Sequence, residues 1–305
     1  MTVREGAVAA RTHRGVRAVA VAVLTGAALA LGGCTPTAGT SASPTPPGRS
    51  ASAAEGSPSP SATAAPSQMP TPTPSPTTAS PSPPVAAPPV SSPYPWHTGI
   101  VSTTFWVGEI FDPNAEDGSQ VISTYDSDWL GSYGGCDGRV VGGQCRTEAR
   151  SAANGYFPTG MTPKQNPFYL DLPYDDINDA KGFAQRDQVI PWASAYAAYR
   201  GNDNVSYMKN RWVELRKGGR VCYGQIEDAG PGQYHDAAYV FGANDARPAN
   251  KEFNGAGLDV SPALNGCLGY AELDGDGDLV DWRFVEADQV PAGPWTRIVT
   301  TSGVR

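Results

Sequence analysis

Short runs rich in hydrophobic and β-branched residues recur through the last two thirds of the chain. The clearest runs cover residues 100–107, 212–215, 221–226 and 279–285, and residues 295–301 predict a last short strand. Lys217-Gly218-Gly219 separates the second run from the third and indicates a β-hairpin turn. Short strands joined by turns rich in Gly, Pro and Asp predict a mostly β fold, a small barrel or a sandwich.

Helical patterns are scarce in the same region. Residues 192–199, with the sequence WASAYAAY, predict one short helix. A second is predicted after Ser261, which suits the N-cap, because Pro262 suits the first helical position and Gly266 follows. We therefore expect strands with loop insertions and a few short helices.

Residues 1–33 predict a signal peptide. Four arginines precede a short apolar stretch, residues 18–31, which is too short to span a bilayer comfortably. Leu31-Gly32-Gly33-Cys34 then resembles the lipobox of bacterial lipoproteins, in which the cysteine is acylated and becomes the first mature residue. We expect Cys34 to be lipidated and the protein to be extracytoplasmic, anchored to the cell membrane. The alternative is an ordinary secretory signal with an incidental cysteine.

Residues 34–95 predict a disordered tether. Of the 29 prolines in the chain, 18 lie between Thr35 and Pro95, where only Arg49 and Glu55 are charged. Such a segment lacks the apolar side chains that would offset the entropy of ordering, and its prolines favour an extended polyproline II conformation. A semi-rigid stalk and a spacer with no required reach both fit this composition.

The remaining residues, 96–305, form one predicted domain with 17 basic and 28 acidic side chains, a net charge of −11. This charge argues against nucleic acid as a partner, and against tight docking to anionic polymers unless cations mediate it. No later apolar run is long enough for a membrane span. The domain is large enough to bury its own core, and we expect a monomer.

Besides Cys34, the chain has Cys136, Cys145, Cys222 and Cys267, which allow three pairings. The first two flank a Gly-rich loop and are expected to close it, which leaves Cys222 to pair with Cys267. The spacing of the cysteines and the presence of only three His argue against a zinc site.

Residues 274–278, with the sequence DGDGD, have the spacing of the first three ligands of a calcium loop. Leu279 and Val285 stand where such a loop needs Gly and Glu, so a solvated acidic turn is the better interpretation. We expect neither a metal nor a cofactor.

Two stretches resemble a known group of proteins. In residues 220–231 (RVCYGQIEDAGP) Asp228 precedes Gly-Pro, and in residues 257–264 (GLDVSPAL) Asp259 precedes Ser261. This pair resembles the double-psi β-barrel group of rare lipoprotein A-like proteins, expansins and family-45 endoglucanases. Residues 103–108 (TTFWVG) and 166–174 (NPFYLDLPY) are similar to two further segments of that group, in the same order. The resemblance covers most of residues 97–300 and implies a six-stranded double-psi β-barrel.

The chain departs from the group at three points. Asp171 stands where the lipoprotein A-like proteins often have a His before Leu-Pro. Near the first strand, where the endoglucanases have a second catalytic Asp, only Glu109 and Asp112 occur, and neither matches cleanly. The added cellulose-binding domain of expansins has no counterpart after residue 299. These departures bear on hydrolytic activity more than on the fold.

The resemblance implies a carboxylate site. Cleavage of a glycosidic bond needs a carboxylic acid, and hydrolysis usually needs a second carboxylate, whereas a lytic transglycosylase can work with one. Asp259 is the predicted acid and Asp228 its partner. As alternatives, Asp228 can hold its own turn and Asp259 can tie down the start of the following helix. Candidate substrate-binding residues are Thr104, Trp106, Tyr174, Tyr223 and His235; each aromatic ring also suits the core, and His235 suits a surface turn.

The sequence therefore predicts a lipoprotein whose barrel binds, and cleaves or loosens, a cell-wall polysaccharide, peptidoglycan first and β-glucan second. The alternative is a non-catalytic binding module or inhibitor-type barrel of the same fold. A solute-binding lipoprotein fits poorly, because it would need two α/β lobes and more helix than the pattern offers.

Overall fold

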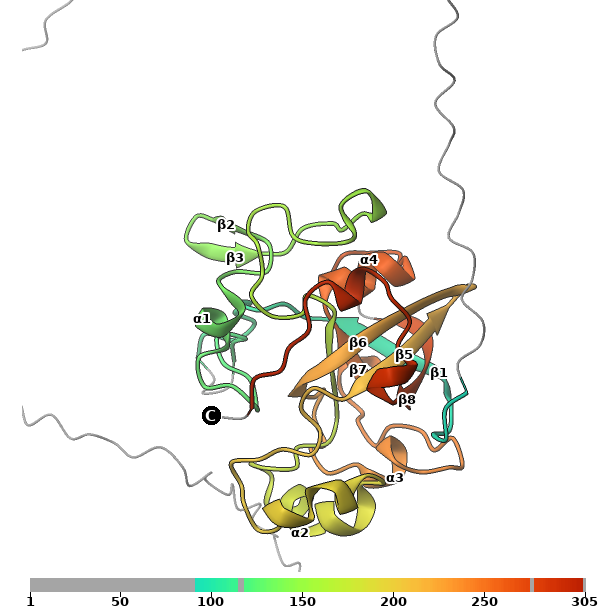
Figure 1. The fold of residues 1–305 in the computed structure, drawn as a ribbon. Helices are drawn as coiled ribbons and strands as arrows, with labels where there is room; N and C mark the ends of the chain where they lie inside the picture. Colours follow the sequence, from blue (N-terminus) through green and yellow to red (C-terminus); the bar gives the residue numbers. More distant parts are fainter. Residues whose placement is uncertain (1–90, 115–117, 275–276, 304–305) are drawn as a thin grey trace, which may run out of the picture. The chain divides into compact units, whose positions relative to one another are not determined.

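The computed structural model describes residues 91–114, 118–274 and 277–303. The predicted signal peptide, Cys34 and nearly all of the predicted tether lie outside the described residues and stay predictions. Within the described residues, six strands close into a barrel in the order β1-β7-β4-β6-β5-β8, with β8 next to β1 (Figure 1). The prediction of a mostly β, barrel-forming chain is confirmed at this level.

The barrel strands are β1 (His97–Thr104), β4 (Tyr169–Leu172), β5 (Trp212–Lys217), β6 (Arg220–Ala229), β7 (Leu258–Val260) and β8 (Asp278–Val285). The pairs β1–β7 and β4–β6 are parallel, and the other neighbouring pairs are antiparallel. Parallel neighbours need long crossover connections. The long connections carry the remaining elements of the fold.

Those elements are short. They are α1 (Trp129–Tyr133), the hairpin of β2 (Arg139–Val141) and β3 (Gln144–Arg146), α2 (Ala180–Val189), α3 (Ala237–Val240) and α4 (Pro262–Leu268). Figure 1 shows the β2–β3 hairpin and α1 on one side of the barrel, and α2 with α3 at another. Single 3-10 turns occur at Ala152–Asn154, Ala193–Tyr199, Phe253–Gly255, Ala287–Gln289 and Pro294–Thr296. No described helix has the length and apolar character needed to cross a membrane.

Two local predictions are confirmed with their expected causes. The hairpin between β5 and β6 turns at Gly218 and Gly219, whose φ values of +52° and +82° favour glycine. Helix α4 begins after Ser261, whose hydroxyl accepts a hydrogen bond from the Leu264 amide at 3.3 Å.

Two local predictions are wrong in detail, and one helix was missed. Residues 295–301 form no strand, because the Thr300 main chain and hydroxyl bond Gln225 and Asn166 instead of a neighbouring strand. Residues 193–199 form a 3-10 turn rather than an α-helix. The longest helix, α2, was not predicted, since only Gly182 and Arg186 are buried along it and apolar periodicity is absent.

The main hydrophobic core draws on all six barrel strands. Each strand contributes at least one buried residue to it: Ile100, Leu170, Val213, Ile226, Leu258 and Val280. Fully burying a side chain of this size stabilises the fold by about 1.5–3 kcal/mol. The core therefore fixes which face of each strand points inward, and with it the direction of the alternate side chains.

Both predicted disulfides are present. Cys136–Cys145 closes the β2–β3 hairpin, and Cys222–Cys267 joins β6 to α4, with Cα atoms 5.5 Å and 6.3 Å apart. The second bridge links the two segments that carry Asp228 and Asp259.

Candidate functional site

Three aspartates lie side by side on three neighbouring strands. Asp171 on β4 is paired with Asp228 on β6 on one side and with Asp259 on β7 on the other. Side chains of directly paired residues lie on the same face of a sheet with Cβ atoms about 5 Å apart. The fold thus brings together both predicted catalytic residues, with a third carboxyl group between them.

A β-bulge in β6 makes this arrangement possible. Leu170 pairs with Ile226, but the next residue, Asp171, pairs with Asp228, so Glu227 is an extra residue in β6. Without it Asp171 would face Glu227, because side chains alternate along a strand. The bulge therefore turns the Asp228 side chain toward Asp171.

The aspartates occupy the face of their strands opposite the main core. Leu170, Leu172, Leu258 and Val260, which flank Asp171 and Asp259 in sequence, all belong to the main core. A strand exposes alternate side chains on opposite faces. Asp171 therefore shares its face with Tyr169, which packs in a second, smaller cluster with Phe105 and Trp129.

Asp259 is the most exposed member of the trio: it is partly exposed, whereas Asp171 and Asp228 are 3% and 5% exposed. Its Oδ1 atom is buried and has no hydrogen-bond partner among the described residues. Burial, with a further contribution from the Asp228 charge, raises the pKa of Asp259 to about 7. A carboxyl group with this pKa can be a proton donor near neutral pH.

Asp228 has two firm hydrogen bonds. Its Oδ1 accepts the main-chain N–H groups of Thr124 at 2.7 Å and Ala229 at 2.8 Å. Burial raises the pKa of Asp228 to about 6, although these hydrogen bonds favour the ionised form. The ionised form of Asp228 therefore has hydrogen bonds that the Oδ1 atom of Asp259 lacks.

Asp171 is the most enclosed of the three. Its Oδ1 accepts the main-chain N–H of Asp259 at 2.8 Å. Burial, together with the charges of Asp259 and Asp228, raises the pKa of Asp171 well above its usual range.

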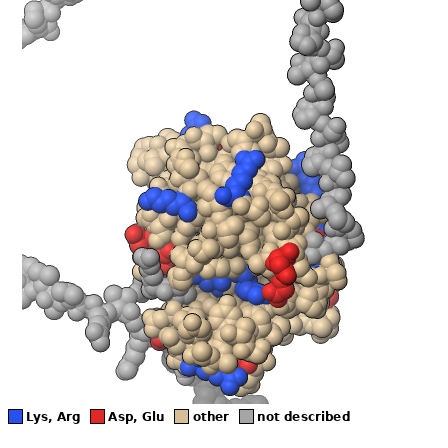
Figure 2. All heavy atoms as spheres, in the orientation of Figure 1, with Lys and Arg blue, Asp and Glu red and all other residues tan. Residues whose placement is uncertain are grey.

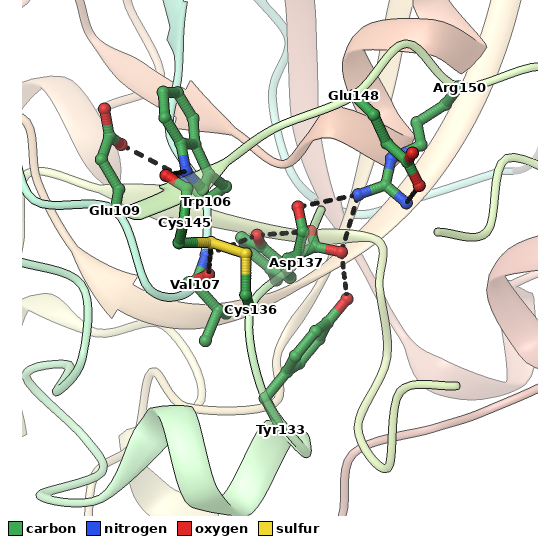
Figure 3. The surroundings of a disulfide bond; sticks show 10 residues. Trp106, Val107, Glu109, Tyr133, Cys136, Asp137, Cys145, Glu148 and Arg150 are labelled. Atoms are coloured by element: carbon green, nitrogen blue, oxygen red, sulfur yellow. Dashed lines mark hydrogen bonds and ion pairs between the residues drawn. A yellow bond between two sulfur atoms is a disulfide. The ribbon is translucent and has the colours of Figure 1, made fainter. Parts of the chain in front are cut away.

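Glu109 adds a fourth carboxyl group. It lies in the turn after β1, where its Oε2 is 3.4 Å from the Trp106 main-chain nitrogen (Figure 3). Burial raises the pKa of Glu109 to about 8, with smaller contributions from Asp274 and Asp259. Glu109 is therefore close enough to Asp259 for the two charges to interact.

A buried ion pair supports the Glu109 turn. The Asp137 and Arg150 side chains, both 0% exposed, are joined at 2.8 Å. The hydroxyls of Tyr133 and Tyr169 donate to Asp137 at 2.7 Å and 2.8 Å, and the Val107 amide donates to the Tyr169 hydroxyl.

Figure 3 shows Asp137 between Arg150 and Tyr133, next to the Cys136–Cys145 disulfide. Tyr169 lies two residues before Asp171 on β4. Through its hydroxyl, the network therefore ties the Glu109 turn to the strand that carries the central aspartate.

Two predicted substrate-binding residues lie near this site. Thr104 ends β1, one residue beyond the pairing of Thr103 with Asp259, and its hydroxyl accepts a hydrogen bond from the Asn265 side chain at 2.9 Å. Trp106 is 6% exposed, and its indole N–H donates to the Cys145 carbonyl at 3.4 Å. Both residues support the site from the β1 side.

The other three predicted binding residues lie in different surroundings. Tyr174 is fully buried in the main core against Phe241, and Tyr223 is 2% exposed in a separate cluster with Trp295. The His235 Nδ1 atom is 3.3 Å from Asp179, the N-cap of α2. In this conformation neither tyrosine ring offers a surface for stacking on a sugar, and a role in binding stays a prediction for all three.

The three aspartates line neither of two cavities, of about 360 and 300 Å³, that the structure contains. On the face drawn in Figure 2, basic and acidic side chains are scattered in small groups. In the described part of the chain no group of three His, Cys, Asp or Glu side chains is arranged to hold a metal ion.

Sequence analysis identified Asp228 and Asp259 but not the roles of Asp171 and Glu109. Asp171 was noted only as a departure from the His of the resembling group, and Glu109 only as a poor match. A usable signal was Asp between apolar residues, in YLDL at 171 and in LDV at 259, because an acidic side chain is unfavourable in a strand without a specific reason.

The comparisons with known proteins leave the family of this chain open. No protein-family model matches its sequence, and no curated protein matches it.

Proposed function

We propose that the barrel is a glycan-binding and glycan-cleaving domain that acts on a cell-wall polysaccharide, peptidoglycan first and β-glucan second. One observation carries the proposal: Asp171, Asp228 and Asp259 lie on adjacent strands, and the partly exposed Asp259 has a pKa of about 7. A protonated carboxyl group with an ionised one nearby is the usual arrangement for hydrolysis of a glycosidic bond.

The fold proposed for this domain is the double-psi β-barrel of rare lipoprotein A-like proteins, expansins and family-45 endoglucanases. The closed six-stranded barrel with both parallel and antiparallel pairs is compatible with that topology. The two stretches of clearest resemblance contribute β6 and β7, the strands of Asp228 and Asp259.

In the proposed reaction Asp259 is the general acid. Its proton passes to the glycosidic oxygen as the bond from that oxygen to the anomeric carbon breaks. Asp228, ionised above pH 6, takes a proton from the attacking oxygen, which belongs either to water or to a hydroxyl of the same sugar. Water gives hydrolysis and the sugar hydroxyl gives an anhydro product, so the product identifies the nucleophile.

The proposed location is the outer side of the cell membrane. The lipobox ending in Cys34 and the tether of residues 34–95 support an anchored domain that extends into the surrounding wall. A lipid anchor on a long extended tether suits a protein whose substrate is an immobile polymer.

One observation favours a binding module without cleavage. Asp228 Oδ1 accepts two main-chain N–H groups, as a residue that merely holds a turn does. In this second proposal the barrel binds the glycan surface, and its carboxyl groups serve the structure.

Co-sedimentation with insoluble glycans tests the binding that both proposals share. The mature chain is mixed with purified peptidoglycan sacculi, with cellulose and with a starch control, and the bound fraction is measured. We expect sedimentation with sacculi, more weakly with cellulose, and none with starch. A protein that stays in solution with every glycan would contradict both proposals.

A further inference from the structure

Asp171 holds Asp259 through the main chain. The Asp259 amide donates to Asp171 Oδ1 at 2.8 Å, and Asp171 is only 3% exposed. Its other oxygen, Oδ2, lies against Gly230, where an added Cβ atom would be only 2.7 Å away. The carboxyl group of Asp171 is therefore fixed on both sides.

The surroundings of Asp171 and Asp259 are acidic. The groups that act most strongly on the pKa values of Asp171 and Asp259 are acidic: Asp259 and Asp228 act on Asp171, and Asp228 acts on Asp259. The titratable groups that face Asp259 are Asp171 from β4, Asp228 from β6, Glu109 from the turn after β1, and the Tyr270 hydroxyl after α4.

Three adjacent carboxyl groups are not all ionised at neutral pH, because like charges at this separation repel strongly. The group that keeps its proton to the highest pH is the one that loses most water and has another carboxyl group on each side. Asp171 meets both conditions, since it lies between the other two.

We propose that Asp171 is a positioning residue: it stays protonated at neutral pH and holds the main chain of Asp259, so that the Asp259 carboxyl group titrates beside an uncharged neighbour. In the proposed reaction Asp171 neither gives nor takes a proton. This inference rests on the proposed function only for its consequence in catalysis, because the location of the proton can be measured without a substrate.

The test compares Asp171→Asn with Asp171→Ala. Asparagine is uncharged, has nearly the same shape and keeps an oxygen for the Asp259 amide, so it imitates protonated Asp171. Alanine removes that acceptor. Asp245→Asn is a matched control, because Asp245 also accepts a main-chain N–H, from Thr98 at 3.0 Å, but is exposed and pairs with Arg247.

Carbon-13 NMR of the aspartate carboxyl groups in the mature chain gives the first result. We expect the Asp171 signal not to titrate between pH 5 and 8. The Asp259 midpoint should move by less than about half a pKa unit in Asp171→Asn and in Asp245→Asn, and should fall by more than about one unit in Asp171→Ala. Ionisation of Asp171 in this range, or a fall of about one unit or more in Asp171→Asn, overturns the inference.

Release of soluble glycan gives the second result. If the proposed function holds, Asp171→Asn should retain most of the wild-type rate and Asp171→Ala should lose at least about tenfold. Loss of activity in Asp171→Asn to the level of Asp259→Asn would mean that Asp171 itself transfers a proton, and would overturn the inference. If no variant releases glycan while the NMR result holds, the proposed function fails and the inference on the proton stands.

If Asp171 is ionised in the wild type, Asp171→Asn should lower the Asp259 midpoint; if Asp171 is protonated, the midpoint should stay the same. Asp171→Asn therefore tests the proposal even if Asp171→Ala does not fold.

Discussion

At the residue scale, hydrogen bonding distinguishes two carboxyl groups that the proposed chemistry uses and whose pKa values burial raises. Asp228, with two main-chain hydrogen bonds, has a pKa of about 6, and Asp259, whose Oδ1 has no described partner, has a pKa of about 7. Between these values an ionised base and a protonated acid exist in the same site. The environments, rather than the residue types, assign the two roles.

The pH dependence of cleavage follows from this assignment. The rate should rise as the pH rises through about 6, where Asp228 loses its proton, and should fall as the pH rises through about 7, where Asp259 loses its own. A profile of kcat/KM against pH measures both limbs. Their midpoints describe the interacting carboxyl groups together rather than one residue alone. A rate that keeps rising up to pH 9 would contradict the assignment of Asp259 as the acid.

The stability of Asp259→Asn should also depend on pH. A carboxyl pKa raised from 3.8 to about 7 means that the folded protein binds this proton more tightly than the unfolded chain. That contribution is present below pH 4 and is lost as the pH rises toward 7, whereas asparagine has no proton to lose. Urea unfolding at pH 4.5 and pH 8 measures the free energy of unfolding of both proteins. The value for the variant minus the value for the wild type should rise by at least about 1 kcal/mol between these two pH values.

Asp281→Asn is a control for this measurement, because Asp281 accepts the Gly99 amide at 2.8 Å away from the three aspartates. The gain should be larger for Asp259→Asn than for Asp281→Asn. Equal behaviour of the two variants would place the Asp259 pKa near its ordinary value.

The sequence identified two of the site residues at this scale, since Asp228 and Asp259 lie within recognisable motifs. Asp171 could not be assigned a role in the same way. Its position opposite Asp228 depends on the bulge at Glu227, and nothing in the local pattern VCYGQIEDAGP signals an extra residue. The role of Glu109 likewise depends on burial after the chain has closed.

At the scale of elements, β6 and α4 are the framework of the site. Strand β6 carries Asp228, α4 begins directly after β7 and Asp259, and the Cys222–Cys267 disulfide joins the two. The hairpin β5–β6 and helix α4 were predictable, because Gly218-Gly219 and Ser261-Pro262 are strong local signals. The terminal segment around Thr300 was not predictable, because its conformation depends on hydrogen bonds to Asn166 and Gln225, which are distant in sequence. Helix α2 was not predictable either, because the N-cap at Asp179 is its main local signal.

The two disulfides should differ in their contribution to stability. Cys222–Cys267 spans 45 residues and Cys136–Cys145 only 9. In the chain-entropy model these loops correspond to about 4 and about 2.6 kcal/mol of unfolding free energy. Thermal unfolding of the two Cys→Ala double variants should therefore show the larger loss for Cys222/Cys267. A larger loss for Cys136/Cys145 would show that this bridge, which lies near the Asp137–Arg150 pair, stabilises the fold more than its loop length predicts.

At the scale of the whole molecule, the chain combines a predicted anchor, a predicted tether and an acidic barrel. The net charge of −11 over residues 96–305 works against retention by anionic wall polymers. A lipid anchor would keep the barrel near the wall without relying on charge.

The anchor gives a prediction of its own. Cys34→Ala should move the protein from the membrane fraction to the medium, because the acylated thiol is the proposed attachment. Detergent partitioning followed by immunoblotting measures the shift, and Cys34→Ser serves as a second variant. Unchanged membrane retention in both variants would contradict lipidation at Cys34.

The most direct measurement is the release of soluble fragments from purified sacculi and from cellulose by the wild-type mature chain and by Asp259→Asn. We predict release from sacculi by the wild type, and a rate lower by about 10²–10⁴ in the variant, which is the range for loss of a general acid. The variant should remain folded and should still sediment with the glycan. Equal release by both proteins would remove Asp259 from the reaction, and no release by the wild type would contradict glycan cleavage altogether.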